Sequence, residues 1–214
     1  MHLRVRLKRG DSSSVTMEVG PVIYLLHTLF TQSDVVIQNK NVTSSTGHYP
    51  YKAMIQTHLK YGKDAKNSQL SSQMWVDDRP SFVDDAKCQS GGNSGLSQRS
   101  VYFAHGKAVD LQGNIFHLLF SMNRYLLNQV WLSVKFYRAR PELYLMTNVA
   151  DADYYIAIED FYLNICKVHC NPGIIYGHDA IFKTTNAKYP FTHTEVRTVS
   201  LPARQISFNF NNIF

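Results

Sequence analysis

The sequence is short of charged residues, of cysteine and of long apolar runs. Charged residues make up 18% of its 214 positions, below the ~25% of an average globular domain, so the polar surface must rely on Ser, Thr, Asn and Gln. Its three cysteines, Cys88, Cys166 and Cys170, show no pairing pattern and favour a reducing compartment. No apolar run approaches the ~18 residues that a membrane span needs. Residues 2–8 lack the apolar centre of a signal peptide.

Positive charge and aromatic side chains are what the sequence does contain. The formal net charge is +6 at pH 7, but no run of five like charges forms a basic tail. This balance suits either a solvated basic surface or a face that meets a polyanion. The 13 tyrosines suit strands and protein interfaces. The length allows one β-sandwich, or two small domains, with a sizeable core.

Alternating polarity predicts that the chain is mainly β. In residues 2–8, Leu3, Val5 and Leu7 share one face, which predicts a half-buried strand, and its abrupt start predicts an open edge. Residues 130–138 carry bulky side chains on both faces, which predicts burial on both sides. The remaining predicted strands are 34–38, 101–104, 107–111, 114–120, 142–147, 154–159, 161–169, 192–201 and 206–210. Short strands at this spacing favour a β-sandwich or jelly roll with helical insertions.

Proline residues mark the starts of three predicted helices. Gly20-Pro21 opens the first, and Asn171-Pro172 opens the last, which extends to about Thr185. The middle one, 49–70, begins at Pro50, with Gly62 predicted as a left-handed C-cap. The apolar side chains of the first helix are expected in the core: Val22, Leu25, Leu26 and Leu29.

The helix that begins at Pro50 has an apolar stripe at helical spacing. Its members, expected to pack on the sandwich, are Tyr51, Met54, Ile55 and Leu59. The residues expected to face solvent are Lys52, Gln56 and Lys60. Asp64 is expected to start a second helical turn that ends at Leu70. A polar stretch at 84–100, rich in Gly and Ser, is predicted to be a mobile surface loop.

Three patterns resemble catalytic or metal-binding sites, but each is better explained by residues with an ordinary structural role. Gly92-Asn93-Ser94-Gly95 faintly resembles a protease nucleophile loop, but it lies among glycines and serines, and no orienting acid accompanies His105. Cys166, His169 and Cys170 would point to different faces of a strand, which favours buried cysteines over a metal site. Asp77-Asp78 and Asp84-Asp85 suit solvated turns. No catalytic residue, cofactor or metal is predicted, and the chain is not expected to be an enzyme.

A series of spaced motifs resembles a known family. The most specific block is Tyr49-Pro50-Tyr51 followed by Tyr61-Gly62-Lys63-Asp64-Ala65-Lys66 and Ser68-Gln69-Leu70. Other blocks, in order, are Gly20-Pro21-Val22, Leu25-Leu26-His27, Leu29-Phe30, Asn93-Ser94-Gly95-Leu96, Val109-Asp110-Leu111, Arg124-Tyr125-Leu126-Leu127-Asn128, Val134-Lys135-Phe136, Pro172-Gly173, Gly177-His178 and Ala187-Lys188-Tyr189-Pro190. Together they resemble the major capsid protein of Polinton/Maverick elements and adintovirus-like viruses.

This resemblance implies a fold and a role. Members of the family fold as double jelly rolls, and their trimers form pseudo-hexameric capsomers of an icosahedral shell around double-stranded DNA. It implies that 1–214 is a single incomplete jelly roll, without the first strand and the second roll, with 201–214 as the start of the hand-over. A truncated or endogenised copy is therefore expected.

The resemblance also implies partners and a location. The expected partners are further copies of the chain, other capsid proteins and, through non-specific contact, packaged DNA, with no membrane span. The expected location is the virion, and the nucleus or cytoplasm of the host cell. The candidate assembly residues are Lys52, Gln56, Lys60, Gly62 and Lys63. The alternative hypothesis is a cellular β-sandwich that binds a protein or glycan through its aromatic surface.

Overall fold

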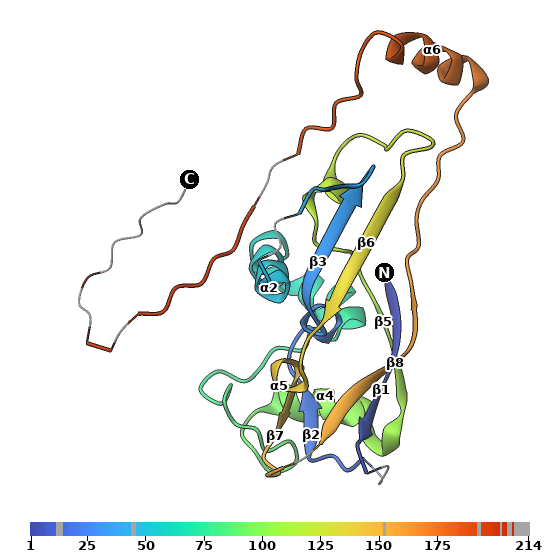
Figure 1. Cartoon of the computed structure of the whole chain (residues 1–214). Coiled ribbons are helices and arrows are strands. Elements are labelled where there is room, and N and C mark those ends of the chain that lie inside the picture. Colours follow the sequence, from blue (N-terminus) through green and yellow to red (C-terminus); the bar gives the residue numbers. More distant parts are fainter. Residues whose placement is uncertain are drawn as a thin grey trace.

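Three small antiparallel sheets and several short helices form the body of the protein (Figure 1). The computed structural model describes residues 1–11, 15–43, 46–151, 153–191, 194–201, 203–204 and 207. Its strands are β1 (His2–Arg9), β2 (Val19–Pro21), β3 (Phe30–Ile37), β4 (Lys40–Asn41), β5 (Ala108–Gln112), β6 (Leu132–Arg138), β7 (Leu145–Thr147) and β8 (Tyr154–Tyr162). The α-helices are α1 (Leu25–Thr28), α2 (Tyr49–Lys60), α3 (Lys63–Asn67), α4 (Ser94–Tyr102), α5 (Pro141–Tyr144) and α6 (Pro172–Phe182). Short 3₁₀ turns are η1 (Gln69–Gln73), η2 (Ala104–Gly106) and η3 (Leu118–Ser121).

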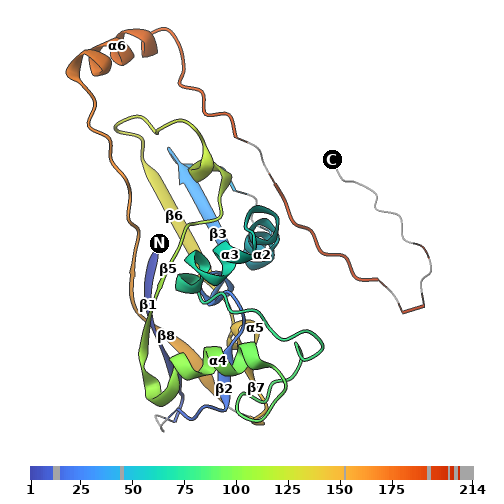
Figure 2. The same cartoon turned by 180° about the vertical axis from the view of Figure 1, so that it is seen from behind.

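The sheets join strands that are far apart in the sequence. Their strand orders are β5-β1-β8, β2-β7 and β4-β3-β6, and every pairing is antiparallel. Figures 1 and 2 show β3 and β6 beside α2 in one half of the body, and β1, β2, β7, β8 and α4 in the other. The prediction of a mainly β chain with helical insertions is thus confirmed at the level of a sheet-rich fold.

The alternation in β1 is confirmed, but its predicted position at an open edge is wrong. Leu3, Val5 and Leu7 are fully buried, as the period-2 pattern predicts. However, β1 is the central strand of its sheet, because β5 and β8 pair with its two edges. On the solvent face the Arg6 guanidinium lies 2.5 Å from Glu159, so an acidic neighbour in β8 partly offsets the basic face of β1.

The predicted helix after Gly20 is shorter than expected, although three of its four predicted core residues are buried and Val22 packs partly buried against them. Pro21 ends β2, and only Leu25–Thr28 is helical. Leu25, Leu26 and Leu29 are fully buried in the main core cluster. Tyr24 precedes the helix with a positive φ of 67°, and this left-handed turn lets the short helix begin directly inside the core.

The bounds of α2 match the sequence prediction, but its buried face does not. Pro50 lies in the first turn, where its missing N–H costs nothing. The buried residues are Tyr49, Pro50, Ala53 and Thr57, not the apolar stripe. Of that stripe Met54 is half-buried, whereas Leu59 is 82% exposed and Tyr51 and Ile55 are about half exposed. The small Ala53 and Thr57 let α2 approach α1 and β3 closely, which turns the larger apolar side chains outward.

This orientation of α2 predicts opposite effects at two apolar positions. Changing Leu59 to lysine should alter the free energy of unfolding by less than ~0.5 kcal/mol, because the side chain is already in solvent. Changing the fully buried Ala53 to leucine should cost about 1–3 kcal/mol through overpacking against the core. Urea denaturation followed by circular dichroism measures both. A larger loss from Leu59→Lys than from Ala53→Leu would show that the stripe is the buried face.

The prediction of a loop over 84–100 is wrong at its C-terminal end, because α4 begins at Ser94. The Asn93 side chain caps this helix by accepting a hydrogen bond from the Leu96 N–H at 3.2 Å. Gly95 and Leu96 are buried against neighbouring segments. A Cβ at Gly95 would lie 2.2 Å from the Asp77 carbonyl oxygen, so only glycine permits this contact. The glycine that suggests a loop in the sequence therefore serves close packing.

Several predicted strands are replaced by other structure. Residues 101–104 continue α4 and enter η2, residues 114–120 are irregular before and into η3, and residues 142–147 are divided between α5 and β7. β6 is half-buried or exposed along its length, so its predicted two-sided burial is wrong. β8 ends at Tyr162, and residues 163–171 are not a strand. Of the predicted strand 192–201, the described residues 194–201 have no regular structure, and most of 206–210 lies outside the described residues.

Candidate assembly surface

A long C-terminal arm, defined as residues 163–191 and 194–201, leaves the body after β8. Figure 1 shows it running to α6 at one end of the molecule and then returning past α2. Asn171 caps α6 by accepting a hydrogen bond from the Gly173 N–H at 2.9 Å, and Pro172 occupies the first turn. The prediction of a helix that opens at Asn171-Pro172 is confirmed.

The arm is exposed over most of its length. Every residue from Asn164 to Lys188 is exposed, and no residue of α6 is buried. The large apolar side chains that α6 presents to solvent are Ile174, Ile175, Tyr176, Ile181 and Phe182. Because an isolated helix of this length is marginally stable in water, α6 needs a surface to pack against.

The returning part of the arm contacts the body through hydrogen bonds. Arg124 donates to the Lys188 carbonyl at 2.9 Å, and the Leu127 N–H donates to the Tyr189 hydroxyl at 3.0 Å. Further along, two side chains of α2 hold Thr194. Lys52 Nζ donates to its carbonyl oxygen at 3.1 Å, and Gln56 Nε2 lies 3.5 Å from its hydroxyl. His48 Nε2 lies 2.9 Å from the Thr198 hydroxyl.

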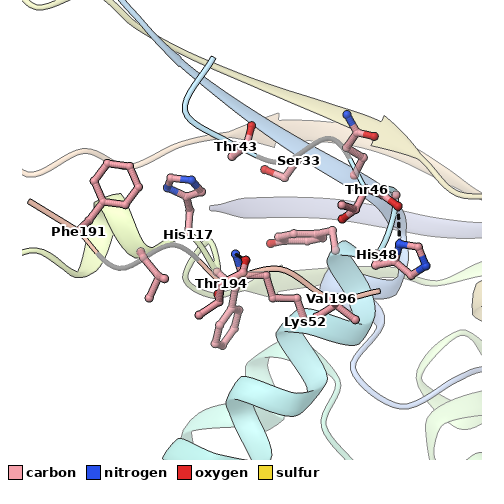
Figure 3. Close-up of a pocket in the computed structure, with 14 residues that line it drawn as sticks. Ser33, Thr43, Thr46, His48, Lys52, His117, Phe191, Thr194 and Val196 are labelled. Carbon is pink, nitrogen blue, oxygen red and sulfur yellow. Dashed lines mark hydrogen bonds between the residues drawn. The ribbon is translucent and has the colours of Figure 1, made fainter. Parts of the chain in front are cut away.

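A cleft lies between this part of the arm and the body (Figure 3). The cleft is open to solvent, and the volume inside it that water can occupy is about 30 Å³. The lining is mixed polar and aromatic and consists of Gln32, Ser33, Thr43, Thr46, Gly47, His48, Tyr49, Lys52, Phe116, His117, Leu118, Phe191, Thr194 and Val196. Lys52 is half-buried beside the arm, and this burial lowers the pKa of its ammonium group.

The structure brings only some of the predicted assembly residues together. Lys52 and Gln56, expected to face solvent, are half-buried because the arm covers them. Lys60 is exposed and lines a second cleft with Gln56. Gly62 and Lys63 are exposed and line neither cleft.

The predicted C-cap role of Gly62 is wrong. Its φ and ψ are −73° and 176°, an extended conformation that any residue can adopt, and it precedes α3. α2 ends because Tyr61 is already extended. A Cβ on Gly62 would touch nothing within 4 Å, so no steric reason for glycine remains at this position.

A buried polar network fixes the base of α2. His27 Nδ1 lies 2.9 Å from the Tyr49 hydroxyl, and His27 Nε2 lies 3.0 Å from Gln73 Oε1. The Tyr24 hydroxyl lies 2.9 Å from the Thr57 hydroxyl. Burial raises the pKa values of both tyrosines and lowers the pKa of His27 to about 3, so all three side chains are neutral. The groups that hold α2 in place are therefore uncharged.

A buried arginine holds the segment that precedes α4. Arg99 is fully buried, and its guanidinium donates to the Pro21 carbonyl at 2.7 Å, to the Val76 carbonyl and to Asp78 Oδ1 at 2.6 Å. Asp78, predicted as a solvated turn residue, is instead a partner in this ion pair. The sequence interpretation missed Arg99, although its spacing of three residues from Leu96 places both on one helical face.

The other candidate sites also differ from prediction. Cys166 and Cys170 are exposed in the arm, so their predicted burial in a core strand is wrong, whereas Cys88 is buried. Asp85 accepts hydrogen bonds from the N–H groups of Gly92 and Lys87, which lower its pKa. Ser94 is exposed at the start of α4. Among the described residues, no group of three or more His, Cys, Asp or Glu side chains could hold a metal ion.

Comparisons with protein-family models, with curated proteins and with solved structures find no match. Within the described part of the chain, none of the helices combines the length and apolar character needed to cross a membrane.

Proposed function

We propose that this chain is a non-enzymatic structural protein that builds a viral capsid by self-association. The proposal takes its family from the spaced sequence motifs that resemble Polinton/Maverick and adintovirus-like major capsid proteins. Under this proposal the body is a jelly roll, and the assembly is an icosahedral shell around double-stranded DNA. The chain is then located in the virion and in the host nucleus or cytoplasm. The net charge of +6 suits a protein that meets packaged DNA.

The observation that carries the proposal is the exposed arm. An arm without a single buried residue between Asn164 and Lys188 gains stability only by contact with another surface. Five large apolar side chains on α6 supply the area for that contact. A shell of identical subunits would provide a neighbouring chain at every such arm. The arm thus supports assembly better than it supports action as an isolated monomer.

Sedimentation velocity over a wide concentration range tests the proposal. We expect the chain to form trimers or larger species, and Ile175→Lys to weaken association at least ~10-fold, which corresponds to ~1.4 kcal/mol for one buried apolar anchor. The matched control is Val101→Lys, because Val101 is as exposed as Ile175 but lies on α4. This control should associate like the unchanged chain.

Two results would contradict the proposal. One is a chain that stays monomeric at every concentration. The other is an equal loss of association in Ile175→Lys and Val101→Lys, which would show that α6 is not part of the interface. A strict monomer that binds a protein or glycan in a saturable manner would instead support a cellular binding module.

A further inference from the structure

We propose that the returning part of the arm, whose described residues are 188–191 and 194–198, exchanges between copies of the chain, so that the arm of one subunit occupies the groove beside α2 of its neighbour. This inference rests on the proposed self-association and names the contact that would link the subunits. The occupant of the groove is already defined by the structure, because the same segment lies against α2 within one chain and forms one wall of the cleft (Figure 3).

The contacts between arm and groove suit exchange because they are local and self-contained. Thr194 receives hydrogen bonds from Lys52 and Gln56, Thr198 bonds with His48, and the Tyr189 hydroxyl accepts from Leu127. Each contact joins an arm residue to a body residue. All of them can therefore form unchanged with the arm of a second copy, which is the energetic condition for exchange of a segment.

The connection between body and arm is long enough to reach a neighbour. The two segments on either side of α6 hold about 15 residues and could span up to ~50 Å if fully extended. α6 has 11 residues and adds about 16 Å. A compact chain of this size has a radius of gyration of about 17 Å. The reach thus exceeds the diameter of the body.

The balance between the closed and the exchanged arm depends on the local concentration of subunits. Residues 164–188 are exposed throughout, so they lose no buried contact when the arm opens. A tethered segment experiences its own groove at a millimolar effective concentration, which favours the closed form in dilute solution. In a shell of identical subunits the grooves of neighbouring chains are present at a comparable local concentration. The arm can therefore bind a neighbour's groove about as readily as its own. Burial of the apolar side chains of α6 against that neighbour then makes the exchanged form the more stable one.

Thiol cross-linking between two tagged chains tests the exchange. Both chains carry Cys166→Ser and Cys170→Ser, which remove the exposed thiols. One chain carries Gln56→Cys and the other Thr194→Cys; in the unchanged chain Gln56 Nε2 lies 3.5 Å from the Thr194 hydroxyl, and a short bis-maleimide bridges the gap left by the shorter cysteine side chains. After co-expression, concentration and brief treatment with the cross-linker, we expect a linked species that carries both tags, at several times the yield of a control with Lys63→Cys in place of Gln56→Cys.

A single chain that carries both Gln56→Cys and Thr194→Cys completes the design. Exchange predicts covalent dimers and larger species that increase with concentration. A linked monomer at every concentration, without a mixed product above the control, would overturn exchange, and so would the absence of any cross-linked product. If the unchanged chain still sediments as an oligomer in that case, the exchange fails while the proposed self-association stands.

Discussion

Replacement of Arg99 by methionine is expected to lower the free energy of unfolding by about 3–5 kcal/mol. The guanidinium is fully buried and binds β2 through the Pro21 carbonyl, and the segment before α4 through Val76 and Asp78. Methionine fills a similar volume but donates no hydrogen bond. It would leave the Asp78 carboxylate, which is 15% exposed, without its cation. Loss of one partner from a buried pair costs more than loss of both.

Urea denaturation of three variants separates the causes. Arg99→Lys retains the charge but not the planar fork that reaches three acceptors, so an intermediate loss is expected. Asp78→Asn combined with Arg99→Met removes both charges and should be less destabilising than Arg99→Met alone. Arg140→Met is the control, because Arg140 is exposed. A loss below ~1 kcal/mol for Arg99→Met would show that the pair contributes little.

Acid is expected to destabilise the protein through His27. Burial lowers the pKa of this imidazole to about 3, from its ordinary value of 6.5. Between these two values the unfolded chain binds a proton and the folded chain does not, so stability falls as the pH falls. The expected slope is about 1.4 kcal/mol per pH unit across this range. Above pH 6.5 the residue contributes no pH dependence.

The hydrogen bonds of His27 explain why the folded chain resists protonation. Gln73 Oε1 accepts from Nε2–H, and Tyr49 donates its hydroxyl proton to Nδ1. The Tyr49 hydroxyl already accepts from the Phe116 N–H. A proton on Nδ1 would therefore require the Tyr49 hydroxyl to accept twice and would take away the acceptor that its own hydrogen now has in Nδ1. The charged imidazolium would also lie against Tyr24 and Phe116, with no carboxylate among these contacts.

Denaturation midpoints measured from pH 7.5 to pH 4 test this prediction. His27→Gln should be less stable at pH 7 but should flatten the decline at low pH, because glutamine does not titrate. His178→Gln is the control, since His178 lies exposed on α6. It should keep the full decline. An unchanged acid slope in His27→Gln would assign the effect to other groups.

Local patterns predicted those elements whose residues determine them locally. Strand β1 follows from alternation alone, since Leu3, Val5 and Leu7 need only a common apolar face. The start of α2 follows from Pro50. Helix α4 could have been found from Asn93 as a capping residue, but the surrounding glycines and serines are typical of loops.

Faces and pairings depended on distant residues and could not be predicted. Thr57 is buried because Tyr24, from another part of the chain, supplies a hydrogen-bond partner. Without that partner we would expect the threonine to face solvent and Leu59 to face the core, which is the arrangement that the sequence predicts. Likewise Lys52 and Gln56 are covered by Thr194, whose position depends on a long irregular arm. No local pattern contains that information.

The central position of β1 also sets the order in which the chain can fold. Its two partners, β5 and β8, begin only at Ala108 and Tyr154. At a synthesis rate of ~5–20 residues per second, the ribosome needs roughly 8–30 s after β1 before β8 is complete. During that interval a strand with one apolar face and two unpaired edges is exposed to other nascent chains. The protein is therefore expected to depend on chaperones during synthesis and to refold slowly in vitro.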